Sequence, residues 1–251
     1  MSHLQRSQLH NLAIILQRYP IPRNGLVVYI ETSGFNPGSA VIIDHAVCNL
    51  VDGVIPADGV VSAGILNWTG LLADSLEMRL ATDLGRIQTT QQPVSTRPAF
   101  PYVMNMLRNS PYDGYETMAT AVTTLAAALL QQRPVIGHGL LGFSWPFLKT
   151  FLPAGDSDSA YTDLLLENVY DTALIEKASM EGEDWLPEVN LPFSAWQRRV
   201  GGYYSKCKWS LRNALFEKYN MSVEPGQMYL AEDMARVNVA ILKQWERAVS
   251  G

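Results

Sequence analysis

The sequence predicts an α/β protein in which a mixed sheet, three antiparallel strands and then parallel ones, is flanked by helices. The apolar run 27–30, bounded by turn residues, is typical of a strand buried on both faces. Val51-Asp52-Gly53 closes a second apolar run and is a hairpin signal. From residue 115 onward helical and strand patterns alternate, which favours parallel strands.

Each element follows from its apolar spacing and its boundary residues. After a helix within residues 1–22 and the strand at 27–30, strands are expected within 39–52, 54–66, 134–137 and 169–170, and helices within 115–131, 143–151, 209–219, 229–249 and from Thr172. Residues 1–25 are interpreted as an N-terminal helical extension, and 26–251 as a single domain. Insertions are expected near 68–112 and 181–208, and the stretch 181–202 is expected to be irregular.

Composition narrows the function classes. The 251 residues are 47% hydrophobic and carry a net charge of -5, so any nucleic-acid contact must come from a local basic patch. Cys48 and Cys207 are too far apart for a metal-ligand spacing, and reduced thiols are expected. With no signal-peptide pattern and no apolar run of about 18 residues, the sequence predicts a cytoplasmic protein without a membrane span.

Three stretches carry residues suited to chemistry. Glu31 stands at the end of the strand predicted at 27–30. A buried carboxylate there costs free energy unless hydrogen-bond donors or cations surround it, so Glu31 is a candidate site residue. The alternative is that Glu31 is a solvated residue at the end of a strand. His138 ends the short strand 134–137, and Ser144 is a plausible helix N-cap. Tyr229 and Asp233 are four residues apart, so both project from one face of the last predicted helix and could form part of a site. The alternative is that this spacing reflects only the amphipathic pattern of the helix.

Together these stretches resemble the motifs of the DEDD 3′–5′ exonucleases, the ribonuclease-H-like family that includes polymerase proofreading domains. Tyr29-Ile30-Glu31 stands at the family's Asp-x-Glu motif, and the stretch 138–144 stands at its second motif. Tyr229 to Asp233 matches the Tyr-x-x-x-Asp motif of the tyrosine subgroup, the DEDDy type. The resemblance covers about residues 26–249 and implies a ribonuclease-H-like fold.

The resemblance also implies which chemistry is weakened. In this family four carboxylates hold two divalent metals that activate water and stabilise the phosphate. Tyr29 and Ser144 replace two of the family's aspartates, so Glu31, Tyr229 and Asp233 remain as catalytic remnants. We therefore expect no cofactor, or a single Mg²⁺ or Mn²⁺ held weakly by Glu31 and Asp233, and lost or very slow cleavage.

Two further carboxylates lie away from the motif positions. Asp44 falls within the second apolar run and is a spare carboxylate. Asp171 directly precedes a predicted helix and is expected to cap it.

A basic stretch indicates where a nucleic acid would bind. Residues 189–216 contain no acidic residue, and aromatic residues interleave with the basic ones, which suits phosphate contacts and base stacking. The candidate nucleic-acid-binding residues are Thr32, His138, Arg198, Arg199, Lys206, Lys208 and Arg212, and the aromatic ones are Trp196, Tyr203, Tyr204 and Trp209. The alternative is a surface loop and a solvated helix face, with the aromatic residues in the core.

Three hypotheses follow from the sequence. The preferred one is an exonuclease-fold protein that binds a single-stranded DNA or RNA 3′ end, or a replication or repair protein, without efficient cleavage. The second is an active metal-dependent exonuclease in which His138 substitutes for a missing ligand. The third is a protein-interaction or structural module that no longer binds nucleic acid.

Overall fold

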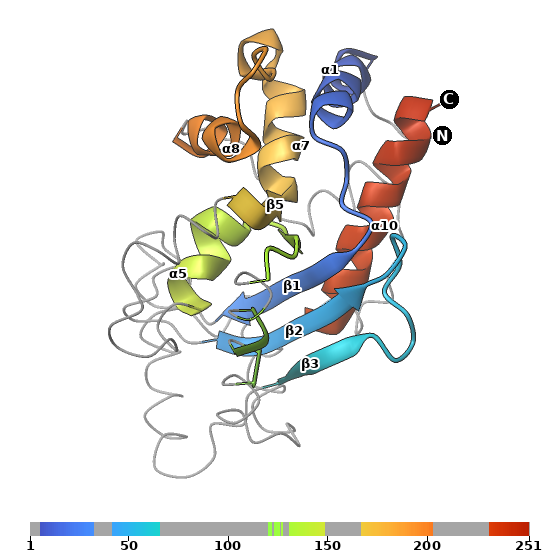
Figure 1. Ribbon diagram of the computed structural model, residues 1–251, viewed down its shortest axis with the longest axis vertical. Coiled ribbons are helices and arrows are strands. Elements are labelled where there is room, and N and C mark those ends of the chain that lie inside the picture. Colours follow the sequence, from blue (N-terminus) through green and yellow to red (C-terminus); the bar gives the residue numbers. More distant parts are fainter. Residues whose placement is uncertain are drawn as a thin grey trace, which may run out of the picture.

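The computed structural model describes residues 6–32, 42–65, 120–121, 123–125, 127, 131–148, 167–202 and 231–250 (Figure 1). The strands are β1 (Gly25–Thr32), β2 (Ile42–Leu50), β3 (Val60–Ile65), β4 (Val135–Gly137) and β5 (Val169–Asp171). The helices with described bounds are α1 (Arg6–Arg18), η2 (Leu140–Ser144), α5 (Trp145–Leu148), α7 (Thr172–Glu181), η4 (Glu183–Trp185), α8 (Phe193–Gly202) and α10 (Ala231–Ser250). None of these described helices is long and apolar enough to cross a membrane.

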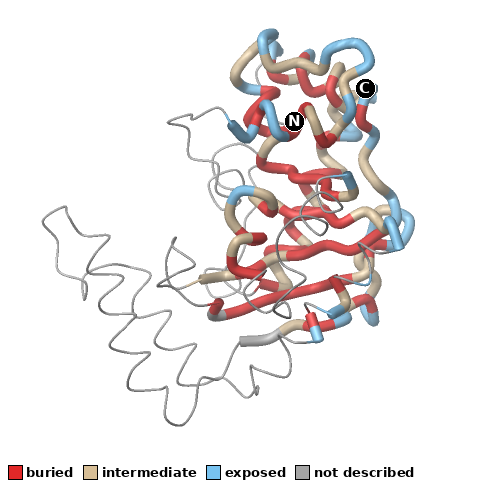
Figure 2. The backbone as a smooth tube through the Cα atoms, turned by 60° about the vertical axis from the view of Figure 1, so that its left-hand side comes forward, coloured by how far each residue is buried: buried red, intermediate tan, exposed pale blue. Residues whose placement is uncertain are grey.

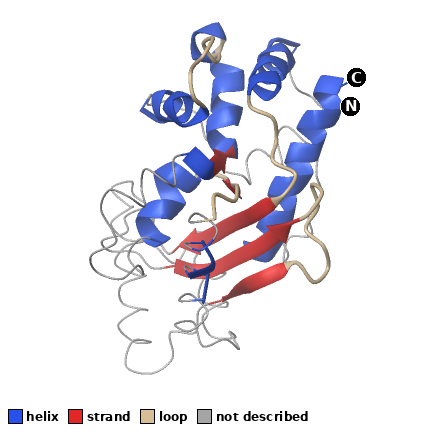
Figure 3. Ribbon diagram, viewed as in Figure 1, coloured by secondary structure: helices blue, strands red, loops and turns tan. Residues whose placement is uncertain are grey.

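The strands form one five-stranded mixed sheet in the order β3-β2-β1-β4-β5 (Figure 3). β1 pairs antiparallel with β2, and β2 pairs antiparallel with β3. β4 runs parallel to β1, and β5 runs parallel to β4. The predicted α/β class, with three antiparallel strands followed by parallel ones, is therefore confirmed.

The hairpin signal also proves correct. Val51 and Val54 exchange backbone hydrogen bonds, and the turn between them has positive φ at both central residues, 50° at Asp52 and 77° at Gly53. Two positive φ values are the requirement of the type I′ turn, which explains the Asp-Gly pair. The backbone N–H of Gly53 also donates to the Arg23 carbonyl at 2.7 Å, which ties the turn to the segment before β1.

The two faces of the sheet build two core clusters, because successive side chains of a strand point to opposite faces. Val27, Ala46 and Cys48 lie in the cluster that also holds α10 residues such as Met234 and Trp245. Leu26 and Val28 join the other cluster, with residues of η2 and α5. Figure 2 shows the resulting buried band through the sheet, as predicted for a first strand covered on both sides.

The N-terminal helix belongs to the same core. α1 contributes Leu12 and Ile15, which are almost completely buried in the cluster that holds α10. The stretch predicted as a helical extension thus packs against the elements that cover the sheet.

The stretch 181–202 differs from the sequence expectation. Instead of an irregular insertion, it forms η4 and the ten-residue helix α8. Trp196 and Val200 of α8 are completely buried, so the hydrophobic contacts of these two side chains stabilise a helix that the propensity pattern did not reveal.

α8 also protects one edge of the sheet. The Gln197 side chain accepts from the Asp171 backbone N–H at 3.0 Å and donates to the Val169 carbonyl at 2.8 Å. These two bonds reproduce the pairing that a neighbouring strand would give to β5. An edge with its polar groups paired is closed to other chains.

Candidate functional site

The first group of the candidate site lies at the carboxyl end of β1. Tyr29 and Glu31 are two residues apart, so both side chains project from the same face of the sheet. The Tyr29 hydroxyl donates to Glu31 Oε1 at 3.1 Å, and both side chains are half-buried. A neutral phenol thus holds one oxygen of the glutamate, at the position where the sequence resemblance calls for an aspartate.

Asp44 lies directly opposite Glu31 in the β1–β2 register. Its side chain is only 2% exposed, and both of its oxygens accept hydrogen bonds from the backbone. Oδ1 accepts from the N–H of His45 at 2.8 Å, and Oδ2 accepts from the N–H of Ala231 at 2.7 Å. Because Ala231 opens α10, Asp44 caps this helix from a strand 187 positions earlier.

Asp44 is electrostatically linked to the other acidic groups of the site. Burial raises the pKa of Asp44 to about 7, against the lowering effect of its two backbone hydrogen bonds, and the charges of Glu31 and Asp233 raise it further. Asp233 lies in the first turn of α10, and burial followed by the Glu232 charge raises its pKa, while Arg236 lowers it. Three carboxylates, on β1, β2 and α10, therefore converge at this end of the sheet.

Asp171 confirms the predicted helix cap and does more. It is completely buried at the end of β5, and its Oδ1 accepts from the Ala173 N–H of α7 at 3.0 Å and from the Gly139 N–H at 2.8 Å. Its Oδ2 accepts from the Leu141 N–H at 3.0 Å. Burial raises the pKa of Asp171, against the three N–H donors and the nearby His138. This carboxylate thereby fixes the glycine turn that follows β4.

His138 and Ser144 lie on either side of that turn. His138 directly follows β4, and its Nδ1 is 3.0 Å from Thr172 Oγ1. Ser144 is buried as the last residue of η2, and its backbone N–H donates to the Gly139 carbonyl at 3.1 Å. Ser144 directly precedes α5, the place predicted for a cap, although the turn before it is π-helical.

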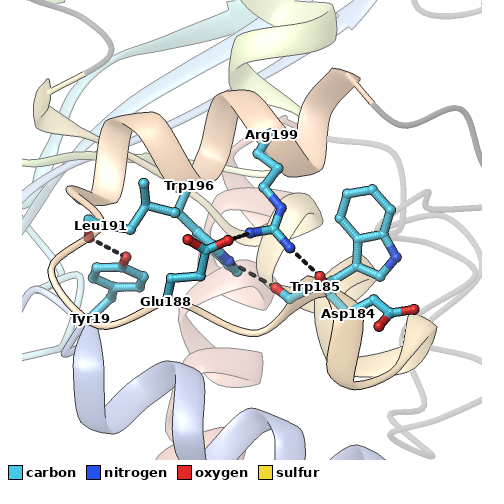
Figure 4. Close-up of polar contacts among 7 residues, drawn as sticks. All are labelled: Tyr19, Asp184, Trp185, Glu188, Leu191, Trp196 and Arg199. Carbon is cyan, nitrogen blue, oxygen red and sulfur yellow. Dashed lines mark hydrogen bonds and ion pairs between the residues drawn. The ribbon is translucent and has the colours of Figure 1, made fainter.

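The two arginines of α8 have different surroundings. Arg199 forms an ion pair with Glu188, donates to the Asp184 carbonyl and lies over the Trp185 ring at 5.8 Å from its centroid (Figure 4). Arg198 is exposed. Arg199 therefore helps to hold the loop before α8.

Trp196 does not suit the stacking role that its place in the basic stretch suggested. The ring is completely buried, and its Nε1 donates to the Trp185 carbonyl at 2.9 Å (Figure 4). It also packs against Tyr19 and Phe193. For this residue the core alternative is correct, because a base cannot reach a ring with no exposed surface.

Of the other predicted site residues, the structure places only Thr32 among those it describes. Thr32 is half-buried at the end of β1, where it pairs with Ile42. The remaining sequence candidates lie outside the described residues: Tyr229, Lys206, Lys208, Arg212, Tyr203, Tyr204 and Trp209. The insertion 68–112 and the helix predicted at 209–219 also lie there.

The described carboxylates are largely bonded to donors of the protein itself. Asp44 and Asp171 each have both oxygens engaged by backbone N–H groups, and the Tyr29 hydroxyl takes one oxygen of Glu31. Divalent cations such as Mg²⁺ need several oxygen ligands, and Mg²⁺ needs them in near-octahedral geometry. Across the described part of the chain, no cluster of three or more His, Cys, Asp or Glu side chains is arranged to hold a metal ion.

The residue that sequence reasoning undervalued is Asp44. The sequence predicts only a spare carboxylate at this position, yet Asp44 joins β2 to α10 and lies beside Glu31. The available signal was one charge inside the apolar run 41–47, because a carboxylate in a buried strand must have compensating donors.

Fold and site together define an α/β protein with a mixed sheet and a cluster of carboxylates at the carboxyl end of its central strand. No known family model matches the chain, and no curated protein matches it either.

Proposed function

We propose that this protein is a degenerate homologue of the DEDD 3′–5′ exonucleases, with a ribonuclease-H-like fold that binds a nucleic-acid strand end without efficient cleavage. The strand order and directions support this proposal, since an antiparallel β3-β2-β1 unit continued by parallel β4 and β5 is compatible with that fold. So does the common location of the motif remnants Glu31 and Asp233 near one end of the sheet.

The observation that carries the proposal is the hydrogen bond from Tyr29 to Glu31. A phenol is neutral at physiological pH, so it cannot supply the charge of a bridging carboxylate. By donating to Glu31, it also occupies one of the lone pairs with which this carboxylate could bind a metal. A two-metal reaction would have to displace this bond and recruit carboxylates that are already engaged as caps.

The same arrangement favours binding over cutting. The pKa of Asp44 near 7 means that this group is partly neutral at physiological pH. Fewer negative charges at this end of the sheet reduce the repulsion of a phosphate backbone. Exposed Arg198, together with Lys206, Lys208 and Arg212, supplies the cations for phosphate contacts in this proposal. A replication or repair protein is the proposed partner.

Binding is tested by fluorescence anisotropy with labelled single-stranded DNA and RNA over a series of KCl concentrations. We expect the logarithm of the binding constant to fall linearly with the logarithm of salt. Joint replacement of Lys206, Lys208 and Arg212 by alanine should reduce the slope by about 2 to 3. An absence of binding to both polymers at low salt would contradict the proposal and favour a protein-interaction module.

Cleavage is tested with the same strands and Mg²⁺ or Mn²⁺. We expect negligible hydrolysis by the wild type, and Glu183→Gln, an exposed glutamate of η4, serves as the control for Glu31→Gln. Hydrolysis that disappears in Glu31→Gln and persists in Glu183→Gln would identify an active exonuclease instead. The double variant Tyr29→Asp with Ser144→Asp should gain metal-dependent activity if the inherited site is otherwise intact.

A further inference from the structure

A buried hydroxyl group connects three elements beneath the candidate site. Thr172 opens α7, and its Oγ1 is 3.2 Å from the Gly137 carbonyl oxygen of β4. The same atom is 2.9 Å from the amide end of Asn238 on α10 and 3.0 Å from Nδ1 of His138. Thr172 and Asn238 are each 1% exposed, so these contacts are made without competition from bulk water.

The number of protons on each group determines which group donates and which accepts in each of these contacts. A hydroxyl group donates one hydrogen bond and accepts two. The Gly137 carbonyl can only accept, so the single proton of Thr172 belongs to that contact. The other two neighbours must then donate to Thr172 if all three short distances are hydrogen bonds. His138 therefore donates from Nδ1, and Asn238 donates from its NH₂ group.

The Asn238 amide supports this count. With its oxygen turned toward Thr172, its Nδ2 group is buried with no hydrogen-bond partner among the described residues. The oxygen and nitrogen of an asparagine amide are interchangeable in shape, and the network decides between them. Exchanging the two gives Nδ2 a partner in Thr172 and leaves a buried carbonyl instead, which proteins tolerate more readily than a buried N–H.

We propose that Thr172 and Asn238 are positioning residues that hold His138 as the tautomer with its proton on Nδ1. Nε2 then carries the lone pair of the neutral ring and is a hydrogen-bond acceptor. His138 lies one residue beyond the Val28–Gly137 pair, on the strand next to Tyr29 and Glu31. The ring thus presents an acceptor nitrogen of fixed identity at this end of the sheet.

This assignment does not depend on nucleic-acid binding, and it is tested on the protein alone. We would record imidazole ¹⁵N NMR spectra of ¹⁵N-histidine protein at a pH where the rings are neutral. The chain has four histidines, and the spectrum of His138→Gln identifies the signals of His138. We expect one tautomer, with the proton on Nδ1. A neutral His138 with its proton on Nε2 in the wild type would overturn the proposal, whatever the variants do.

Variants then identify the residue responsible. Thr172→Val removes the hydroxyl group, and we expect His138 to change to a mixture of tautomers, whereas Thr172→Ser should keep the single one. Ser179→Ala removes another buried hydroxyl group of α7, one bonded to Gln8 and to the Glu176 carbonyl, and should leave His138 unchanged. An unchanged tautomer in folded Thr172→Val would refute the role of Thr172.

Discussion

Asp44 provides the sharpest test of the carboxylate cluster, through the variant Asp44→Asn. In the folded protein the pKa of Asp44 is raised to about 7 from 3.8, chiefly by burial. A raised carboxyl pKa means that the folded state binds the proton more tightly than the unfolded state. The stability that this gives is present below about pH 4 and is lost as the pH rises through about 7. Between pH 5 and pH 8 the loss is about 2 to 3 kcal/mol, which is more than half of the whole effect.

The assay is urea denaturation at pH 5, 6, 7 and 8, followed by tryptophan fluorescence. The asparagine side chain of the variant cannot ionise, so the wild type should lose about 2 to 3 kcal/mol more than the variant between pH 5 and pH 8. Asp58→Asn, at an exposed position before β3, is the control and should follow the wild-type curve. Parallel curves for the wild type and Asp44→Asn would show that this carboxylate is not buried beside Glu31 and Asp233, and the site as described would be incorrect.

Three other predictions concern the surroundings of the site. Gln197→Leu leaves two buried backbone groups of β5 unpaired and should lower the free energy of unfolding, measured by urea denaturation, by about 3 kcal/mol. The control Gln8→Leu should lower it by less. Arg199→Ala breaks a surface ion pair and should lower it by less than about 1 kcal/mol in the same assay; a larger loss would mean that the loop depends on this clamp. Burial raises the pKa of the Cys48 thiol to about 11, so in a Cys207→Ser background iodoacetamide should label Cys48 at pH 8 only after urea is added, and rapid labelling of the folded protein would contradict this.

Local patterns were sufficient for most of the sheet. β1 lies between two core clusters, so its side chains are apolar on both faces and the continuous apolar run predicts a buried strand. Asp52-Gly53 predicts a turn, and Asp171 predicts a helix cap, because these residues favour the conformations that such positions need. These features depend on neighbours within a few positions, which is the range that a pattern of residue types can describe.

Long-range contacts explain what the sequence did not reveal. Asp44 is important because its carboxylate meets Ala231, 187 positions away, and no local pattern encodes that distance. α8 is stabilised by burial of Trp196 against the loop and Tyr19, so a stretch rich in basic residues became a helix with its tryptophan inside. The stretch is rich in basic residues, but packing decides which of its side chains face the core and which face solvent.

The charges of the carboxylate cluster are held in place by groups of the protein itself. Two close carboxylates repel each other in a buried setting unless a cation or a set of donors compensates for them. Here the opening N–H of α10 offsets part of the cost of the Asp44 charge, and the Tyr29 hydroxyl donates to Glu31. Donors of the protein itself thus bond the carboxylates of this cluster. Because protein groups already bond these carboxylates, adding Mg²⁺ should stabilise the protein little, whereas removal of the Tyr29 hydroxyl should destabilise it.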